Sequence, residues 1–321
     1  MLGSNMLSSS GKSRRNNDYW RRLGRDIIRN RWLYLLLLPG IAWFLVYRYL
    51  PMLGLYIAFS DFSIVKGIWG SDFVGLQYFK YIFFEHRNFW QLVRNTLLIN
   101  VYKLAFYFPI PILLALLLNE IVFLRYKRVL QTVIYLPHFV SWVVFGSIII
   151  TFLNPSEGII NQLIQLFGGQ PVFFMSNPKY FRSIVVASDI WKEAGWGTII
   201  YLAAITGIDP TLYEAARIDS ANKVQIMRYI TLPSISETIV IMLLLDIGRI
   251  MNVGFEQIFV LANSTVYSTG DVISTYVYRI GIGNGRFSLT TAIGLFQSVI
   301  GLVLLLSCNA LSRRFFDKGL W

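Results

Sequence analysis

The chain has 321 residues, of which 55% are hydrophobic, 16% aromatic and only 14% charged, whereas about a quarter of the residues in a soluble domain are charged. The formal net charge of +12 does not indicate nucleic-acid binding, because the basic residues lie between long apolar stretches instead of forming one basic stripe. One cysteine, Cys308, and two histidines exclude an internal disulfide and argue against a Cys/His metal site. The composition therefore predicts an integral membrane protein.

Six apolar stretches follow a basic N-terminal arm at residues 1–31. Since a bilayer core takes about 20 mostly apolar residues per helix, we expect an all-α membrane domain of six transmembrane helices over 32–312. A short tail, 313–321, comes after it. The predicted spans are 32–58, 95–119, 129–153, 183–207, 234–260 and 288–312.

The distribution of Lys and Arg predicts the orientation of these spans, because cytoplasmic connections carry an excess of both. One side receives eight basic residues from the arm and three each from 119–128, 208–232 and the tail, while the other side receives six. Both termini are therefore expected in the cytoplasm, as an even number of spans requires.

Ionisable residues at bilayer depth indicate functional sites, because exposing them to lipid is costly. The fourth and fifth spans carry most of them, so we expect these two spans to line a path for a polar substrate. Asp246 and Arg249 are three residues apart on one face and can pair, and Asn252 and Glu256 extend that face by helical spacing. Lys192 and Glu193 are adjacent and cannot face each other on a helix, so each should need another partner. Arg48, Lys103 and Asp189 are further ionisable residues in or near the spans. The path candidates are Lys192, Glu193, Asp246, Arg249, Asn252 and Glu256.

The connection 208–233 is long and patterned. Asp209 is placed to cap a helix that begins at Pro210, where proline has no amide to leave unsatisfied. We expect a short helix that carries Glu214, a break near Asp219 and Ser220, and a second helix over 221–230 before the fifth span. Such a pair of helices suits docking into a cleft, although an amphipathic pair at the membrane interface is an equally simple reading.

The same residues resemble the EAA loop of permease subunits in binding-protein-dependent ABC importers. Every fixed position of that motif matches except one, where this chain has Ser220 in place of glycine. Either the turn is right-handed here, or a left-handed serine costs about 1 kcal/mol. Further similarities run through 32–312 and favour the branch that imports oligosaccharides and polysaccharide fragments. The residues that the motif assigns to this loop are Glu214, Ala215, Ala216, Asp219, Ser220, Ile230, Leu232 and Pro233.

The resemblance implies a transport subunit of the bacterial inner membrane that has no catalytic site and binds no cofactor or metal. A second homologous permease would complete the path, two partner ATPase subunits would bind ATP and Mg and contact the loop, and a soluble binding protein would deliver the sugar on the outer face. Membrane lipid surrounds such a subunit, and no nucleic acid is involved. The excess of basic residues leans toward an acidic, uronate-type substrate such as alginate or pectin fragments.

Two other functions stay open at this point. An ion-coupled secondary transporter built from repeats of three spans would use carboxylates such as Asp246 and Glu256 near the midplane, but it would leave the patterned loop unexplained. A membrane enzyme lacks support because the chain has no zinc-binding His-Glu-x-x-His sequence, nucleophile elbow or phosphate loop.

Overall fold

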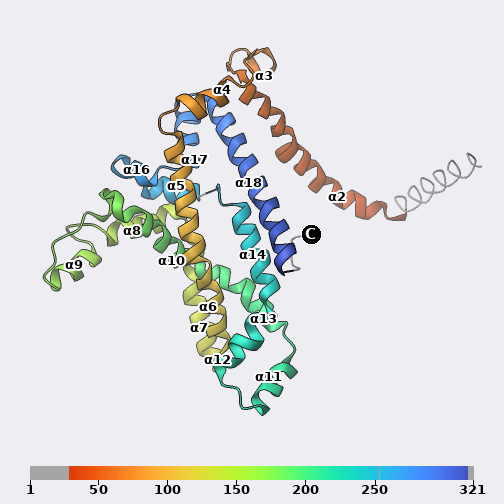
Figure 1. The fold of residues 1–321 in the computed structure, drawn as a ribbon, viewed down its shortest axis with the longest axis vertical. Coiled ribbons are helices and arrows are strands. Elements are labelled where there is room, and N and C mark those ends of the chain that lie inside the picture. Colours follow the sequence, from red (N-terminus) through yellow and green to blue (C-terminus); the bar gives the residue numbers. More distant parts are fainter. Residues whose placement is uncertain (1–28, 253, 317–321) are drawn as a thin grey trace, which may run out of the picture.

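The computed structural model describes residues 29–252 and 254–316, so most of the predicted arm and residues 317–321 of the tail lie outside the described residues. The chain is almost entirely helical (Figure 1). Three helices are long and apolar enough to cross a membrane: Arg31–Phe59, Phe89–Asn119 and Phe287–Arg314. Two bent helix pairs also qualify, so the described residues contain up to five candidate spans by length and composition.

The first part of the first candidate span stands apart from the rest of the molecule, whereas its last residues pack against the C-terminal helix. Helix α2 (Arg31–Phe44) continues through a π-helical segment, η1 (Leu45–Tyr49), and a 3-10 segment, η2 (Leu50–Phe59). In Figure 1, α2 leads away from the other helices, and none of its residues is buried within the described chain. Its apolar surface is therefore left to lipid or to another chain.

Short elements close one end of the molecule. Strands β1 and β2 pair antiparallel, with Ser60 opposite Phe73, and form a small two-stranded sheet in an otherwise helical fold. They hold the chain that joins the first span to the second. These elements are β1 (Ser60–Asp61), α3 (Gly67–Gly70), β2 (Asp72–Phe73), α4 (Gln77–Lys80) and η3 (Tyr81–Glu85).

The second candidate span is one continuous helix, whereas the third is a bent pair of helices. The helix of 31 residues from α5 to α6 is followed by α7, which meets α8 at an angle of 101°. The bend follows from Pro137, which begins a 3-10 turn, and from Ser141, whose hydroxyl accepts a hydrogen bond from the Val144 amide and caps α8. The elements are α5 (Phe89–Tyr102), η4 (Lys103–Tyr107), α6 (Pro109–Asn119), α7 (Leu124–Tyr135), η5 (Leu136–Phe139), α8 (Trp142–Phe152), α9 (Ile159–Leu166) and η6 (Phe174–Ser176).

Helix α10 (Pro178–Thr206) is the centre of the fold and packs against α5, α6 and α7. It has 29 residues, but it carries charged residues in its middle and is not among the apolar candidate spans. A Cβ at Gly195 would lie 2.1 Å from the Ile134 carbonyl oxygen, so glycine is what allows α7 to approach this closely.

The predicted fifth span, 234–260, is not one helix. Helix α14 (Ser236–Gly248) ends at Gly248, and α15 (Phe255–Leu261) is a separate element. Before α14 the chain bends by 62°. The remaining elements are α11 (Pro210–Ile218), α12 (Lys223–Ile226), η7 (Met227–Thr231), α13 (Leu232–Ser234), η8 (Ser264–Val266), α16 (Tyr267–Gly270), α17 (Ile273–Val277), η9 (Tyr278–Gly283) and α18 (Phe287–Phe316).

Candidate functional site

The loop 208–233 forms the end of the molecule opposite α3 and α4 (Figure 1). As expected, Asp209 caps α11: its carboxylate accepts a hydrogen bond of 2.9 Å from the Thr211 amide, and this bond holds the pKa of Asp209 below its usual value. Glu214 and Ala215 are exposed, whereas Ala216 is buried. Helix α11 therefore presents Glu214 and Ala215 to the surroundings.

Ser220 adopts the left-handed conformation with φ 56°, the only positive φ of a non-glycine residue in the described ranges. The Ala221 amide donates to the Ala216 carbonyl over 2.9 Å, and the Ser220 amide donates to the Arg217 carbonyl over 3.1 Å. These two bonds form a Schellman motif, which favours glycine at the position that Ser220 occupies. The left-handed alternative is therefore confirmed, and serine carries the strain of about 1 kcal/mol.

The second helix of the loop begins at Lys223, two residues later than predicted, because Ser220 and Ala221 complete the Schellman motif. Asn222 and Gln225 form a reciprocal capping box at its start. Between α11 and α12 lies a pocket of about 320 Å³ whose lining includes Ala216, Asp219, Ser220 and Ile230. The two helices are thus held by local bonds on either side of this pocket.

The loop 208–233 contacts the ends of the neighbouring long helices. The hydroxyls of Tyr213 and Thr231 lie 3.2 Å apart, and this contact connects α11 to the segment that leads into α14. Leu232 packs against the buried cluster of Ala115, Tyr201 and Ile235, while Pro233 is exposed. These contacts join α11 to the packing of α6, α10 and α14.

A polar cavity of about 170 Å³ lies among α5, α10 and the end of α14. Its central contact is an ion pair of 3.2 Å between Lys103 Nζ and Asp189 Oδ1, both largely shielded from solvent. Lys103 also donates to Gln257 Oε1 over 2.8 Å, and Gln257 donates to the Ser188 hydroxyl over 2.9 Å. The polar lining residues are Asn100, Lys103, Tyr107, Asp189, Asp246, Arg249 and Asn252.

The structure divides the six predicted path residues. Asp246, Arg249 and Asn252 line the cavity, whereas Glu256 is exposed on α15. The expectation that Asn252 and Glu256 continue the helical face of Asp246 and Arg249 is wrong, because α14 ends at Gly248.

Lys192 and Glu193 belong to a different cluster at the bend between α7 and α8. Their side chains form an ion pair of 3.1 Å, which corrects the expectation that these neighbours cannot face each other. Each also has the separate partner that we expected: Lys192 donates to the His138 carbonyl over 2.7 Å, and Glu193 lies 2.6 Å from His138 Nδ1. Trp196 stacks on the His138 ring at 4.4 Å. These contacts attach the bend between α7 and α8 to α10.

Lys103, Asp189, Asn100 and Gln257 were not among the predicted site residues. The charges of Lys103 and Asp189 within apolar stretches were the available signal, and only the fold shows that they pair. Asn100 and Gln257 carry no signal in the sequence, because amides are common on helices that pack against one another.

Comparison with known proteins decides the family. The family described as "Binding-protein-dependent transport system inner membrane component" matches residues 107–317. The chain belongs to this family. It is a permease, the non-catalytic membrane component of a bacterial ABC importer, as the loop motif predicted. The family assignment therefore decides against both the ion-coupled transporter and the membrane enzyme.

Similar permeases come from Bacillus subtilis (strain 168). The chain is 47% identical to Protein LplB over 91% of this chain and 92% of that protein. It is 44% identical to the "Polygalacturonan/rhamnogalacturonan transport system permease protein YteP", with 94% of each chain covered. A solved "bacterial alginate ABC transporter in complex with alginate pentasaccharide-bound periplasmic protein" contains a chain that is 43% identical, with a TM-score of 0.85, over 93% of this permease and 100% of that chain. This similarity confirms that the chain has the helical membrane fold of the family.

Proposed function

We propose that this permease moves an acidic oligosaccharide of the uronate type through a path that it forms with a second, homologous permease. The observation that carries this proposal is the cavity beside the Lys103–Asp189 pair. Arg249 lines that cavity with an exposed side chain, and in the described part of the chain no carboxylate forms an ion pair with it. An exposed guanidinium without an ion-pair partner can bind a sugar carboxylate through two parallel hydrogen bonds.

The similar proteins support the same substrate class. One of them is a polygalacturonan/rhamnogalacturonan permease and another belongs to an alginate importer, and these polymers are acidic polysaccharides. In this chain, Asn252 and Asp246 lie beside Arg249 in the cavity and can bind sugar hydroxyls. Asp189 and Asp246 balance Lys103 and Arg249 in the cavity lining, and Lys103 is already paired with Asp189. Arg249, which forms no ion pair in the described residues, is therefore the cation that can bind a sugar carboxylate.

The loop 208–233 contacts an ATPase subunit in this proposal. Glu214 and Ala215 form the exposed face of α11, and the contacts of Tyr213 and Leu232 pass its movement to the spans. Two such ATPases bind ATP and Mg, and a soluble binding protein delivers the sugar at the opposite end of the molecule. Six spans, with both termini in the cytoplasm, place the loop and the basic connections on the ATPase side.

Reconstituted transport tests the substrate class. The permease, its partner permease, the ATPases and the binding protein are placed in proteoliposomes, and ATP-dependent uptake of tetragalacturonate is compared with uptake of a neutral tetrasaccharide. Arg249→Gln should lower uptake of the uronate about tenfold or more, since a hydrogen bond to a charged group contributes about 1.5–3 kcal/mol. Arg87→Gln removes an exposed guanidinium outside this cavity and serves as the control. Equal uptake of both sugars, or an unchanged Arg249→Gln variant, would contradict the proposal.

A second measurement tests the role of the loop. Glu214→Lys reverses one charge on the exposed face of α11 and should abolish the stimulation of ATP hydrolysis by the loaded binding protein. Arg125→Glu reverses the charge of an exposed residue of α7, outside the loop, and is the control for a change of charge. Full stimulation of the Glu214→Lys complex would show that α11 does not meet the ATPase.

A further inference from the structure

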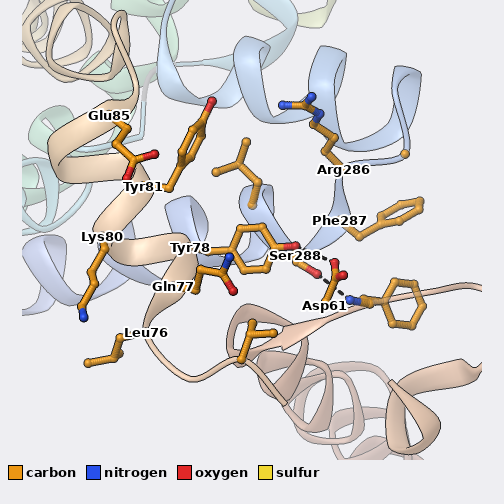
Figure 2. A pocket seen from close by; sticks show the side chains of 14 residues that line it. Asp61, Leu76, Gln77, Tyr78, Lys80, Tyr81, Glu85, Arg286, Phe287 and Ser288 are labelled. Carbon is orange, nitrogen blue, oxygen red and sulfur yellow. Dashed lines mark hydrogen bonds between the residues drawn. The ribbon is translucent and has the colours of Figure 1, made fainter. Parts of the chain in front are cut away.

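A second and larger cavity, of about 870 Å³, lies at the end of the molecule opposite α11. Segments far apart in the sequence form it: the chain after β1, the segment from α4 to η3, and the start of α18 (Figure 2). Its volume falls within the range of about 300–1,000 Å³ that is usual for small-molecule sites. The proposed path does not include this cavity.

The walls of this outer cavity are fixed by bonds between its segments. The Phe62 amide donates to the Ser288 hydroxyl over 2.9 Å, and the Tyr78 hydroxyl donates to Asp61 Oδ1 over 2.7 Å (Figure 2). The β1–β2 pair holds Asp61 from the other side. The side chains are therefore positioned before any ligand arrives, which reduces the cost of binding.

Aromatic rings and one cation face each other across this cavity. Figure 2 shows Tyr78 and Tyr81 on the α4–η3 segment opposite Arg286 and Phe287 at the start of α18. Arg286 is exposed, and among the described residues no carboxylate is in an ion pair with it. Two carboxylates, Asp61 and Glu85, also line the cavity on the side of the α4–η3 segment and β1. Lys80 extends away from Arg286, so Arg286 is the cation on the α18 side of the cavity.

We propose that this outer cavity is an accessory binding site for one or two units of an acidic saccharide, separate from the path beside Arg249. The inference rests on the proposed uronate substrate. Arg286 binds the sugar carboxylate, the rings of Tyr78 and Tyr81 pack against the apolar face of the sugar, and Gln77 and Asp61 bind its hydroxyls. The site holds saccharide at the outer face without enclosing it, since most of its polar side chains are exposed.

Direct binding to the complex tests this site. The permease, its partner permease and the ATPases are purified in a nonionic detergent without the binding protein, and binding of tetragalacturonate is measured by isothermal titration calorimetry. Arg286→Gln should weaken binding about tenfold or more, and Arg286→Lys should weaken it less, because lysine keeps the charge but loses the planar fork. Arg87→Gln should bind as the unchanged protein does. Arg286→Gln should still weaken the remaining binding when it is combined with Arg249→Gln, because the two sites are separate. A neutral tetrasaccharide should bind more weakly than the uronate.

Several outcomes would overturn this inference. They are absence of binding to the unchanged complex, equal binding by Arg286→Gln, and, when the binding protein is titrated in a separate measurement, a loss that appears only in its affinity for the complex. The last result would identify the cavity as a protein contact. Failure of the proposed function is a different result, namely no ATP-dependent uptake of tetragalacturonate while calorimetric binding and its loss in Arg286→Gln persist.

Discussion

The pairing of Lys103 with Asp189 allows a quantitative test of the packing around the cavity. The two groups lie 3.2 Å apart, and their side chains are only 14% and 13% exposed. Lys103→Met leaves the Asp189 carboxylate without its cation and leaves Gln257 Oε1 without its donor. Breaking a buried pair by removing one partner costs about 3–5 kcal/mol, because an uncompensated charge stays buried.

The double variant Lys103→Met with Asp189→Leu provides the decisive comparison. Replacing both ions of a buried pair with apolar groups of similar size is often nearly neutral, so the double variant should recover most of the loss. Each kcal/mol shifts the midpoint of thermal unfolding by roughly 2 °C in a chain of this size. The single variant should therefore lower the midpoint of the purified complex by roughly 6–10 °C.

The assay is thermal unfolding of the assembled complex in detergent, followed by the intrinsic fluorescence of its tryptophans, with uptake measured in parallel. A single variant as stable as the unchanged protein would refute the reasoning, since it would mean that water already solvates Asp189. A double variant less stable than the single one would also refute it, because the pair would then contribute net stability beyond the cost of burying its charges.

Three shorter predictions address other parts of the chain. Ser220→Gly should relieve a left-handed serine and stabilise the loop by up to about 1 kcal/mol, seen as slower hydrogen exchange over 210–233 and contradicted by faster exchange. Gly195→Ala should lower the yield of assembled complex, because its Cβ would meet the Ile134 carbonyl, whereas Gly207→Ala has room and should assemble normally; equal yields would count against this packing. Burial lowers the pKa of His86 from 6.5, so the folded state binds this proton less readily than the unfolded state does, and stability should fall as the pH drops below 6.5 toward the lowered value. His86→Gln should remove that part of the pH dependence, and an identical profile for both proteins would refute it.

Local signals in the sequence were sufficient for the first helix of the loop 208–233. Asp209 followed by Pro210 fixes the start of α11, and the bond from the Thr211 amide confirms the predicted cap. The start of the second helix was placed too early, although Asn222 and Gln225 carry the signature of a capping box. The conformation of Ser220 needed the structure, since serine itself does not favour a positive φ.

The cavity could be predicted only in part, because its residues come from helices far apart in the sequence. The charges of Asp246 and Arg249 indicated their importance, but the break after Gly248 decides that Asn252 joins them and Glu256 does not. Lys192 and Glu193 carry charges just as conspicuous, yet they hold the bend at His138 instead of lining the cavity. A charge in an apolar stretch thus predicts that a partner exists and does not say whether that partner is a substrate.

The isolation of α2 has a consequence for biosynthesis. Because the most apolar part of this helix is not buried by later segments of the described chain, it gains no tertiary stabilisation once the remaining helices have been synthesised. Its direction of insertion is therefore set during synthesis, at the translocon. Its own hydropathy and the eight flanking cations of residues 1–31 determine that direction. Neutralising those cations should lower the fraction of chains in which this helix inserts in its normal direction.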